Sequence, residues 1–189
     1  MAHPQLAPRR HDRVYARPDD LREDGTSWRR ASLEYNENPG ENPLRLYPAH
    51  MLYENKSYER LVDRFGASNV YILSAGRGLI RAGFLTPSYD ITFSSSADDY
   101  KRRRKVDHYE DFRLLPDDTG KDVVFFGGKD YLPLFCSLTD ASRGRRTVFF
   151  NSRQTPQCEG IILRRFETAA RTNWHYQCAQ EFLEGKIHI

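Results

Sequence analysis

Asp90 is the carboxylate of this chain that stands where acid–base chemistry is expected. It ends the extended segment Thr86-Pro87-Ser88-Tyr89-Asp90, which follows an apolar run and a glycine turn. A carboxylate in such a place could activate a water molecule or stabilise the positive charge that develops at a sugar C1′. An aspartate there could equally cap a turn or pair with Arg77 or Arg81, and the sequence leaves both roles open.

The string Thr172-Asn173-Trp174-His175-Tyr176 combines aromatic rings with polar tips. Such a string can form a wall that stacks on an extruded base and hydrogen-bonds its edge. We therefore take Asn173 and His175 as catalytic candidates beside Asp90, with His175 as an acid or a base. The competing interpretation is a helix start with Trp174 in the core, and the density of polar tips favours the wall.

Three apolar runs are expected to position these residues. Residues 69–74, 121–126 and 145–150 are rich in β-branched and aromatic residues, and each run stops at small or polar residues. Helical patterns separate the runs, so they predict an α/β fold, a single domain with a small, mainly parallel sheet flanked by helices. Ligands bind beyond the carboxyl ends of such strands. One glycine loop after a strand often only turns the chain, but three together indicate a site.

The three loops, the extended segment and the aromatic string supply the expected base-binding residues. These are Ser74, Gly76, Tyr89, Gly127, Gly128, Lys129, Asn151, Gln154, Trp174 and Tyr176. Asp130, at the start of the helix after the second run, is expected to cap that helix.

Residues 1–25 mix Pro, Arg and Asp without hydrophobic periodicity, which predicts an irregular N-terminal arm ahead of a domain at 26–189. A loosely attached tail is favoured over an arm that contacts DNA. Turn-forming residues within 26–48 predict a long loop. Helices are expected over residues 49–65, 96–113, 131–138 and 160–184, the last as one or two helices.

A run of five consecutive cations, residues 101–105, is the clearest electrostatic feature. It falls in the expected helix over 96–113, would place charge on all faces of that helix, and favours a nucleic-acid surface. Acidic residues that flank the run could instead neutralise it. The expected contacts to the DNA backbone are Arg77, Lys101, Arg102, Arg103, Arg104, Lys105, Arg153, Arg164 and Arg165.

Composition argues against several classes of protein. The six His and three Cys show no metal-ligand or disulfide-framework spacing, so no metal and a reducing, cytoplasmic location are expected. Nucleotide-binding glycine motifs are absent, so no cofactor is expected. No window approaches the ~20 apolar residues of a membrane span, and no secretory signal is expected. The net charge of +3 permits an anionic partner, and no protein partner is evident.

The stretch LSAGRGLIRAGFLTPSYDITF, residues 73–93, resembles the signature of YaaA-like proteins at the level of a superfamily. Gly78-Leu79-Ile80 and Pro87-Ser88-Tyr89-Asp90 carry the match. The resemblance implies association with DNA, because YaaA-like proteins are linked to DNA protection and a relative takes part in making deazaguanine bases in DNA. The small size, the basic run and the aromatic string also look like those of small phage-defence DNA glycosylases, which remove bulky modified bases.

We therefore expect an enzyme that acts on a base in DNA. The most concrete form is a glycosylase that flips and excises a bulky hypermodified base, such as glucosylated hydroxymethylcytosine, in defence against phage. Trp174 or Tyr176 would stack on the base, and Asn151, Gln154 and Asn173 would read its edge. Three alternatives stay open: DpdC-like conversion of a 7-deazaguanine base in DNA, a DNA-binding module without enzymatic activity, and hydrolysis of a small nucleotide.

Overall fold

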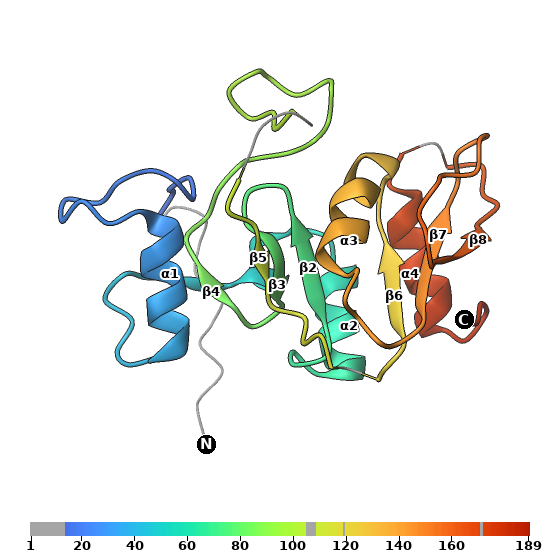
Figure 1. Cartoon of the computed structure of the whole chain (residues 1–189), viewed down its shortest axis with the longest axis horizontal. Helices are drawn as coiled ribbons and strands as arrows, with labels where there is room; N and C mark the ends of the chain where they lie inside the picture. Colours follow the sequence, from blue (N-terminus) through green and yellow to red (C-terminus); the bar gives the residue numbers. More distant parts are fainter. Residues whose placement is uncertain (1–13, 105–108, 119, 171) are drawn as a thin grey trace.

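The computed structural model describes residues 14–104, 109–118, 120–170 and 172–189. Short strands alternate with helices along this part of the chain (Figure 1). The fold is mixed α/β in one domain, as the sequence predicts, but only one sheet of the described residues is entirely parallel. In the same part of the chain, no helix has both the length and the apolar character that a membrane crossing requires. The helices are α1 (Trp28–Glu37), α2 (Ser57–Phe65), α3 (Leu132–Leu138) and α4 (Trp174–Leu183), with 3-10 turns η2 (Ala49–Leu52) and η3 (Lys129–Tyr131). The strands are β1 (Tyr47–Pro48), β2 (Tyr71–Ser74), β3 (Gly78–Arg81), β4 (Leu85–Thr86), β5 (Phe112–Arg113), β6 (Val123–Phe126), β7 (Arg146–Phe150) and β8 (Ile162–Arg165).

The parallel sheet has the strand order β6-β7-β8. The runs VVFF and RTVFF supply the β-branched and aromatic residues of β6 and β7, so both strands and their parallel pairing are predicted correctly. In Figure 1, α3 lies in front of this sheet and α4 behind it. Phe125 and Val148 pack with Phe135 of α3, while Phe149 packs with Cys178 of α4. The helix predicted over 131–138 is confirmed as η3 and α3.

The helical prediction over 160–184 is wrong in its first part and correct in its second, where α4 begins at Trp174. Residues Ile162–Arg165 form β8, which pairs in parallel with Thr147 to Phe150 of β7. Side chains alternate between the two faces of a strand, so Arg164 and Arg165 do not form one cationic patch on a helix.

The first predicted strand, β2, lies outside the parallel sheet. It forms an antiparallel hairpin with β3, in which Ser74 stands opposite Gly78, rather than joining the predicted parallel sheet. Gly78 has a φ of +82°, and a Cβ there would lie 2.6 Å from the backbone oxygen of Phe112. Glycine therefore lets β5 pair in parallel with β3 and complete a second sheet, β2-β3-β5. A third sheet pairs β1 with β4 antiparallel.

Helix α1 is missing from the sequence prediction, which places a long loop in this region. The Ser27 side chain accepts a hydrogen bond from the Arg30 N–H (3.3 Å) and begins the helix. The part of the N-terminal arm that the structure describes is docked rather than loose. The Ala16 N–H donates to the Ser88 carbonyl (2.9 Å), and Ala16 and Pro18 are buried.

No helix occupies the described residues of the region predicted over 96–113. Residues 94–104 form turns instead, and Lys105 lies outside the described residues. Arg103 explains the difference, because its side chain is turned inward, is only 7% exposed and pairs with Asp111 at 2.6 Å. An exposed helix would leave this guanidinium in water and Asp111 without its partner.

A disulfide joins Cys136 of α3 to Cys158, which lies in the segment between β7 and β8. This contradicts the prediction of an unbridged, reduced protein, which rests on the spacing of the cysteines along the chain. The fold brings the two Cα atoms to 6.4 Å, although the residues are 22 positions apart. Cys178 is buried, and burial raises the pKa of its thiol to about 12, so it is a poor nucleophile for exchange with this bridge.

Replacement of Cys136 by Ser is expected to lower the free energy of unfolding of the oxidised protein by roughly 3 kcal/mol, because the bridge restricts the unfolded chain over a loop of this size. Urea unfolding of the oxidised parent and of Cys136→Ser measures the difference. The reduced parent is the control, and it should match the variant. Equal stability of the oxidised and reduced parent would contradict the assignment.

Candidate functional site

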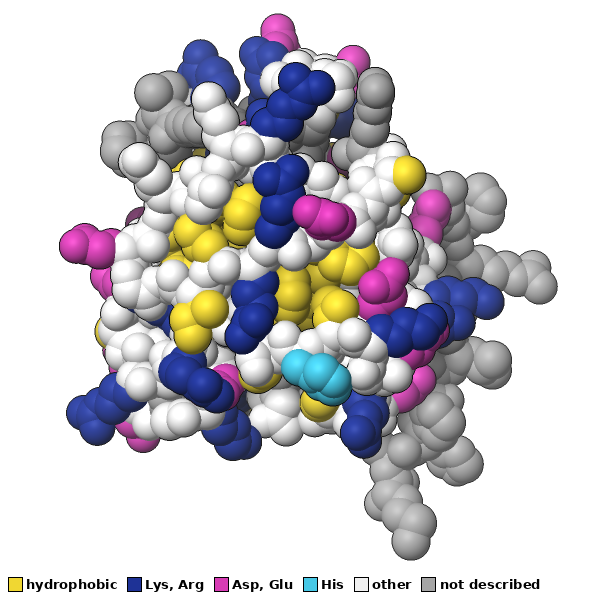
Figure 2. Space-filling model, turned by 90° about the vertical axis from the view of Figure 1, so that its right-hand side faces the viewer, with side chains coloured by type: hydrophobic (Ala, Val, Ile, Leu, Met, Phe, Trp, Pro, Cys, Tyr) yellow, Lys and Arg dark blue, Asp and Glu magenta, His cyan; other side chains and the backbone are white. Residues whose placement is uncertain are grey.

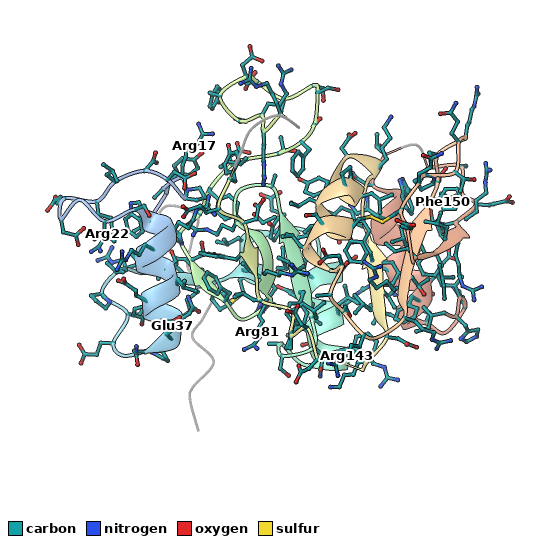
Figure 3. All side chains as sticks on the ribbon, in the orientation of Figure 1. Arg17, Arg22, Glu37, Arg81, Arg143 and Phe150 are labelled. Carbon is teal, nitrogen blue, oxygen red and sulfur yellow. A yellow bond between two sulfur atoms is a disulfide. The ribbon has the colours of Figure 1, made fainter. Side chains whose placement is uncertain are left out.

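A cleft of about 1440 Å³ lies between the sheet β2-β3-β5 and the parallel sheet. One wall comes from β2, β3 and residues 91–94, and the other from β6, β7 and the segments that follow them. The start of α4 closes part of the rim. Phe150, labelled in Figure 3, lines the cleft at the carboxyl end of β7. The volume exceeds the about 300–1,000 Å³ that is typical of small-molecule pockets.

Two of the three predicted strand-end loops converge on this cleft, together with the aromatic string. The predicted site residues that line it are Gly127, Gly128, Lys129, Asn151, Arg153, Asn173, Trp174, His175 and Tyr176. The remaining loop, which follows β2, contributes only Ala75. The carboxyl ends of β6 and β7 meet because the strands are parallel, whereas β2 turns back into a hairpin.

Gly127 and Asn151 have different roles at the ends of their strands. A Cβ on Gly127 would overlap the ring of Phe125, so glycine is required there for packing whether or not a ligand binds. Asn151 carries a buried amide nitrogen, Nδ2, that has no hydrogen-bond partner in the described structure. A buried amide without a partner is costly, and a ligand acceptor in the cleft would satisfy it.

Asn173 precedes α4 with a φ of +59°, a left-handed conformation that asparagine tolerates better than most residues. Its side chain is exposed and does not cap the helix, so its amide faces solvent at the rim. Trp174 lines the cleft and also packs on Phe166 with ring centroids 6.2 Å apart, so it begins α4 and packs against a core cluster, as one of the two sequence interpretations predicts.

His175 is half-buried, and its ring centroid lies 4.1 Å from that of Tyr176. Burial lowers the pKa of His175 below its ordinary value. The imidazole is therefore neutral at pH 7, which suits a proton acceptor or a neutral hydrogen-bonding group better than an acid.

A group of tyrosines continues the aromatic wall into the cleft, and the sequence prediction does not include it. Tyr53 stacks on Tyr58 at 4.6 Å, and Tyr58 meets the edge of Tyr176 at 5.9 Å. Tyr131 also lines the cleft. Desolvation raises the pKa of Tyr53, Tyr58 and Tyr131, so these phenols stay protonated. Three distant segments supply these rings, so no local sequence pattern could have grouped them.

The β2–β3 turn is a buried structural unit rather than part of the cleft. Residues 74–80 are all buried. The Ser74 hydroxyl accepts hydrogen bonds from the Gly76 and Arg77 N–H groups, both at 3.1 Å, and from the Tyr89 hydroxyl at 2.6 Å. Ser74, Gly76, Arg77 and Tyr89, all predicted to contact DNA, are absent from the cleft lining and instead hold the turn.

Three arginines surround this turn. Arg29 donates to the Gly76 carbonyl (3.1 Å) and Arg103 to the Ala75 carbonyl (2.9 Å). Arg77 is fully buried, and its Nε and Nη2 atoms have no hydrogen-bond partner in the described structure. Its guanidinium lies 5.3 Å from the centroid of the Tyr89 ring, and burial lowers its pKa to about 10. Neither Arg77 nor Arg103 has the exposed charge that the predicted phosphate contact needs.

Asp90 lies on the surface, outside the cleft lining, and its carboxylate pairs with Lys101 at 2.7 Å. An ion pair is one of the two roles that the sequence leaves open for Asp90, although the expected partner is Arg77 or Arg81 rather than Lys101. Arg102 pairs with Asp99 at 2.8 Å. Gln154 is exposed and is also absent from the lining. Arg164 and Arg165 are exposed on β8.

Asp130, which the sequence predicts to cap a helix, is a carboxylate of the cleft. Among the described residues, Asp122 and Asp130 are the Asp and Glu residues that line the cleft, and Asp122 is paired with Arg145 at 2.5 Å. Asp130 has no ion pair within the described part of the chain, and η3 has no side-chain cap. Its place two residues after Gly128, in the segment that follows β6, is the signal that could have identified it.

Comparisons with protein-family models, with curated proteins and with solved structures found no match to this chain. Among the described residues, no group of three or more His, Cys, Asp and Glu side chains is placed to hold a metal ion.

Replacement of Arg103 by Met is expected to destabilise the fold by roughly 3–5 kcal/mol, because it leaves Asp111 buried without its partner. Arg77→Met is the matched control, since it removes a buried cation with two unpartnered nitrogen atoms. It should be neutral or stabilising. Urea unfolding measures both. Equal losses in the two variants would contradict the assigned difference between these arginines.

The lowered pKa of His175 predicts a loss of stability in acid. As the pH falls through the ordinary value of 6.5, the unfolded chain binds a proton before the folded chain does, so unfolding becomes more favourable. His175→Gln removes this contribution. The melting temperature should therefore fall less in the variant than in the parent between about pH 7.5 and about pH 5.5. An equal fall in both proteins would show that His175 titrates alike in the two states.

Proposed function

We propose that this protein is an enzyme that acts on a base in DNA, and specifically a glycosylase that excises a bulky modified base. The observation that carries the proposal is the cleft, where aromatic rings, amides and one carboxylate without an ion pair, Asp130, line the space beyond the carboxyl ends of two parallel strands. Aromatic faces bind any base by stacking, amides hydrogen-bond its edge, and the volume leaves room for a substituent. The YaaA-like stretch supports the link to DNA.

Binding of an extruded nucleotide would use the carboxyl end of β7 and the start of α4. Trp174 or Tyr176 would stack on the base, and the Asn151 and Asn173 amides would hydrogen-bond its edge. The unpartnered Nδ2 of Asn151 gives this assignment a physical basis, because an acceptor on the base would remove a buried unsatisfied donor.

The reaction would be hydrolysis of the N-glycosidic bond. A water oxygen would form a bond to C1′ of the deoxyribose while the bond between C1′ and the base breaks with its electron pair. The departing base anion would take up a proton from bulk water, and His175 would return the proton of the attacking water to the solvent. Asp130 would orient the water and stabilise the positive charge at C1′. Neutral His175 would accept the proton that the water loses. Asp130 takes the role that the sequence assigns to Asp90.

Cations near the cleft would hold the phosphates. Lys129 and Arg153 are exposed and line the cleft. On the face of the molecule that carries β8, Figure 2 shows hydrophobic side chains gathered in the middle, with Lys and Arg side chains among and around them. Stacking surfaces with interspersed cations are typical of proteins that bind single-stranded nucleic acid.

The test compares Asp130→Asn with Asp90→Asn on DNA that contains glucosylated hydroxymethylcytosine, and scores abasic sites by alkaline cleavage. Asp130→Asn is expected to lower the rate by about 100-fold or more. Asp118→Asn, an exposed aspartate outside the cleft lining, is the control and should stay within about threefold of the parent. Loss of activity in Asp90→Asn alone would return the chemistry to the segment that the sequence predicts.

Mass spectrometry of the digested nucleosides separates the alternatives. Release of a free base supports the glycosylase. A change in nucleoside mass without a released base would support conversion of the base, as in the deazaguanine alternative. Binding with a steep salt dependence and no change in the DNA would support a binding module.

A further inference from the structure

Residues 93–104 form a loop that projects from the body of the protein, and we call it the projecting loop. In Figure 1 it stands at the end of the molecule toward which the arrows of β2, β6 and β7 point. Thr92 and Ser94 line the cleft, and the Phe93 ring contacts the edge of Tyr131, another cleft residue, at 5.0 Å. The projecting loop therefore begins at the rim of the cleft.

The base of the projecting loop is firmly anchored. The Thr92 N–H donates to the Lys101 carbonyl (2.9 Å), and the Arg103 N–H donates to the Thr92 carbonyl (2.8 Å), so the two ends of the loop lie side by side. The buried Arg103 side chain then ties the outgoing end to Asp111 and to the Ala75 carbonyl. A loop held in this way can keep its position when it contacts a ligand.

Turns within the projecting loop fix its shape. The Lys101 N–H donates to the Asp98 carbonyl (2.9 Å), and the Arg102 N–H donates to the Asp99 carbonyl (3.2 Å). Ion pairs join Lys101 to Asp90 and Arg102 to Asp99. Exposed pairs of this kind contribute little to stability, so a phosphate group can replace the carboxylates as the partner of either cation.

Tyr100 is the exposed aromatic residue of the projecting loop. It is 63% exposed, and the Lys101 ammonium lies 5.4 Å from its ring centroid. Tyr100 is thus a large exposed ring on an anchored loop, with cations beside it, and the loop begins at the rim of the cleft. These are the features that a wedge residue requires. When a base leaves a duplex, a side chain that fills the gap offsets the lost stacking.

We propose that Tyr100 is a wedge that enters double-stranded DNA and occupies the space left by the extruded base, while Lys101 and Arg102 contact the phosphates on either side. This inference rests on the proposed function. It assigns to Tyr100 a role in positioning the substrate, and it commits the protein to duplex DNA as a substrate. The ring does not touch the reacting atoms.

The experiment compares Tyr100→Ala with the parent on matched substrates, one duplex and one single-stranded, that carry the same glucosylated hydroxymethylcytosine. Release of the base should fall roughly tenfold or more on the duplex and stay unchanged on the single strand, where no stack has to be filled. Tyr100→Trp should retain the activity on the duplex. Tyr15→Ala, which removes a tyrosine that is 58% exposed outside the projecting loop, is the matched control.

A second readout follows the extrusion itself. The imino proton of the guanine opposite the modified cytosine gives a nuclear magnetic resonance signal that disappears when the base pair opens. The parent should weaken this signal on the duplex, and Tyr100→Ala should weaken it several-fold less at a protein concentration that saturates binding.

The two proposals fail in different ways. Base release by the parent from single strands, with Tyr100→Ala equal to the parent on duplexes, overturns the wedge and leaves the glycosylase standing. No base release by the parent from either substrate overturns the glycosylase and the wedge together. A loss by Tyr100→Ala that is equal on both substrates overturns the wedge, since it shows a general contact with DNA.

Discussion

The buried turn between β2 and β3 is the constraint on which the rest of the structure depends. Arg29 and Arg103 donate to two buried backbone carbonyls of this turn, and the Tyr89 hydroxyl donates to the Ser74 side chain, so the turn is held by residues from three other parts of the chain. Each partner in turn fixes a segment: α1 through Arg29, the projecting loop through Arg103, and the strand-like segment after β4 through Tyr89. One hairpin therefore determines where the N-terminal half of the protein places its side chains.

The aromatic residues connect this turn to the cleft. The Tyr89 hydroxyl that donates to Ser74 lies 3.5 Å from the hydroxyl of Tyr53, which stacks on Tyr58, which contacts Tyr176 of the candidate site. Desolvated phenols and rings in contact fill the space beside the cleft and leave little room for movement. The position of Tyr176 thus depends on packing that begins at the turn, although the turn itself contributes only Ala75 to the cleft lining.

The sequence predicts the parallel strands β6 and β7, the helix between them and the polar loops that follow, because their apolar runs and glycine turns are local signals. It also identifies the rim residues Asn173 to Tyr176. It misplaces Asp90, Arg77 and the basic run, because burial and pairing decide the role of a charged residue and neither can be seen in residue order. Arg103 looks like its neighbours in sequence, yet it alone of residues 101–104 is buried. The disulfide and the tyrosine group escape prediction for the same reason, since each joins residues that only the fold brings together.

The cleft lies along the seam between two parts of one chain. Residues before 118 build one wall and residues after 120 build the other, so neither part contains a complete cleft. A molecule that touches both walls is bound only when the two parts are docked, and its binding free energy is added to the stability of that docking. Occupancy should therefore be visible as slower hydrogen exchange along the seam, in backbone amides that the ligand never touches. Ligand binding would then be detected by hydrogen exchange alone, without an assay of catalytic activity.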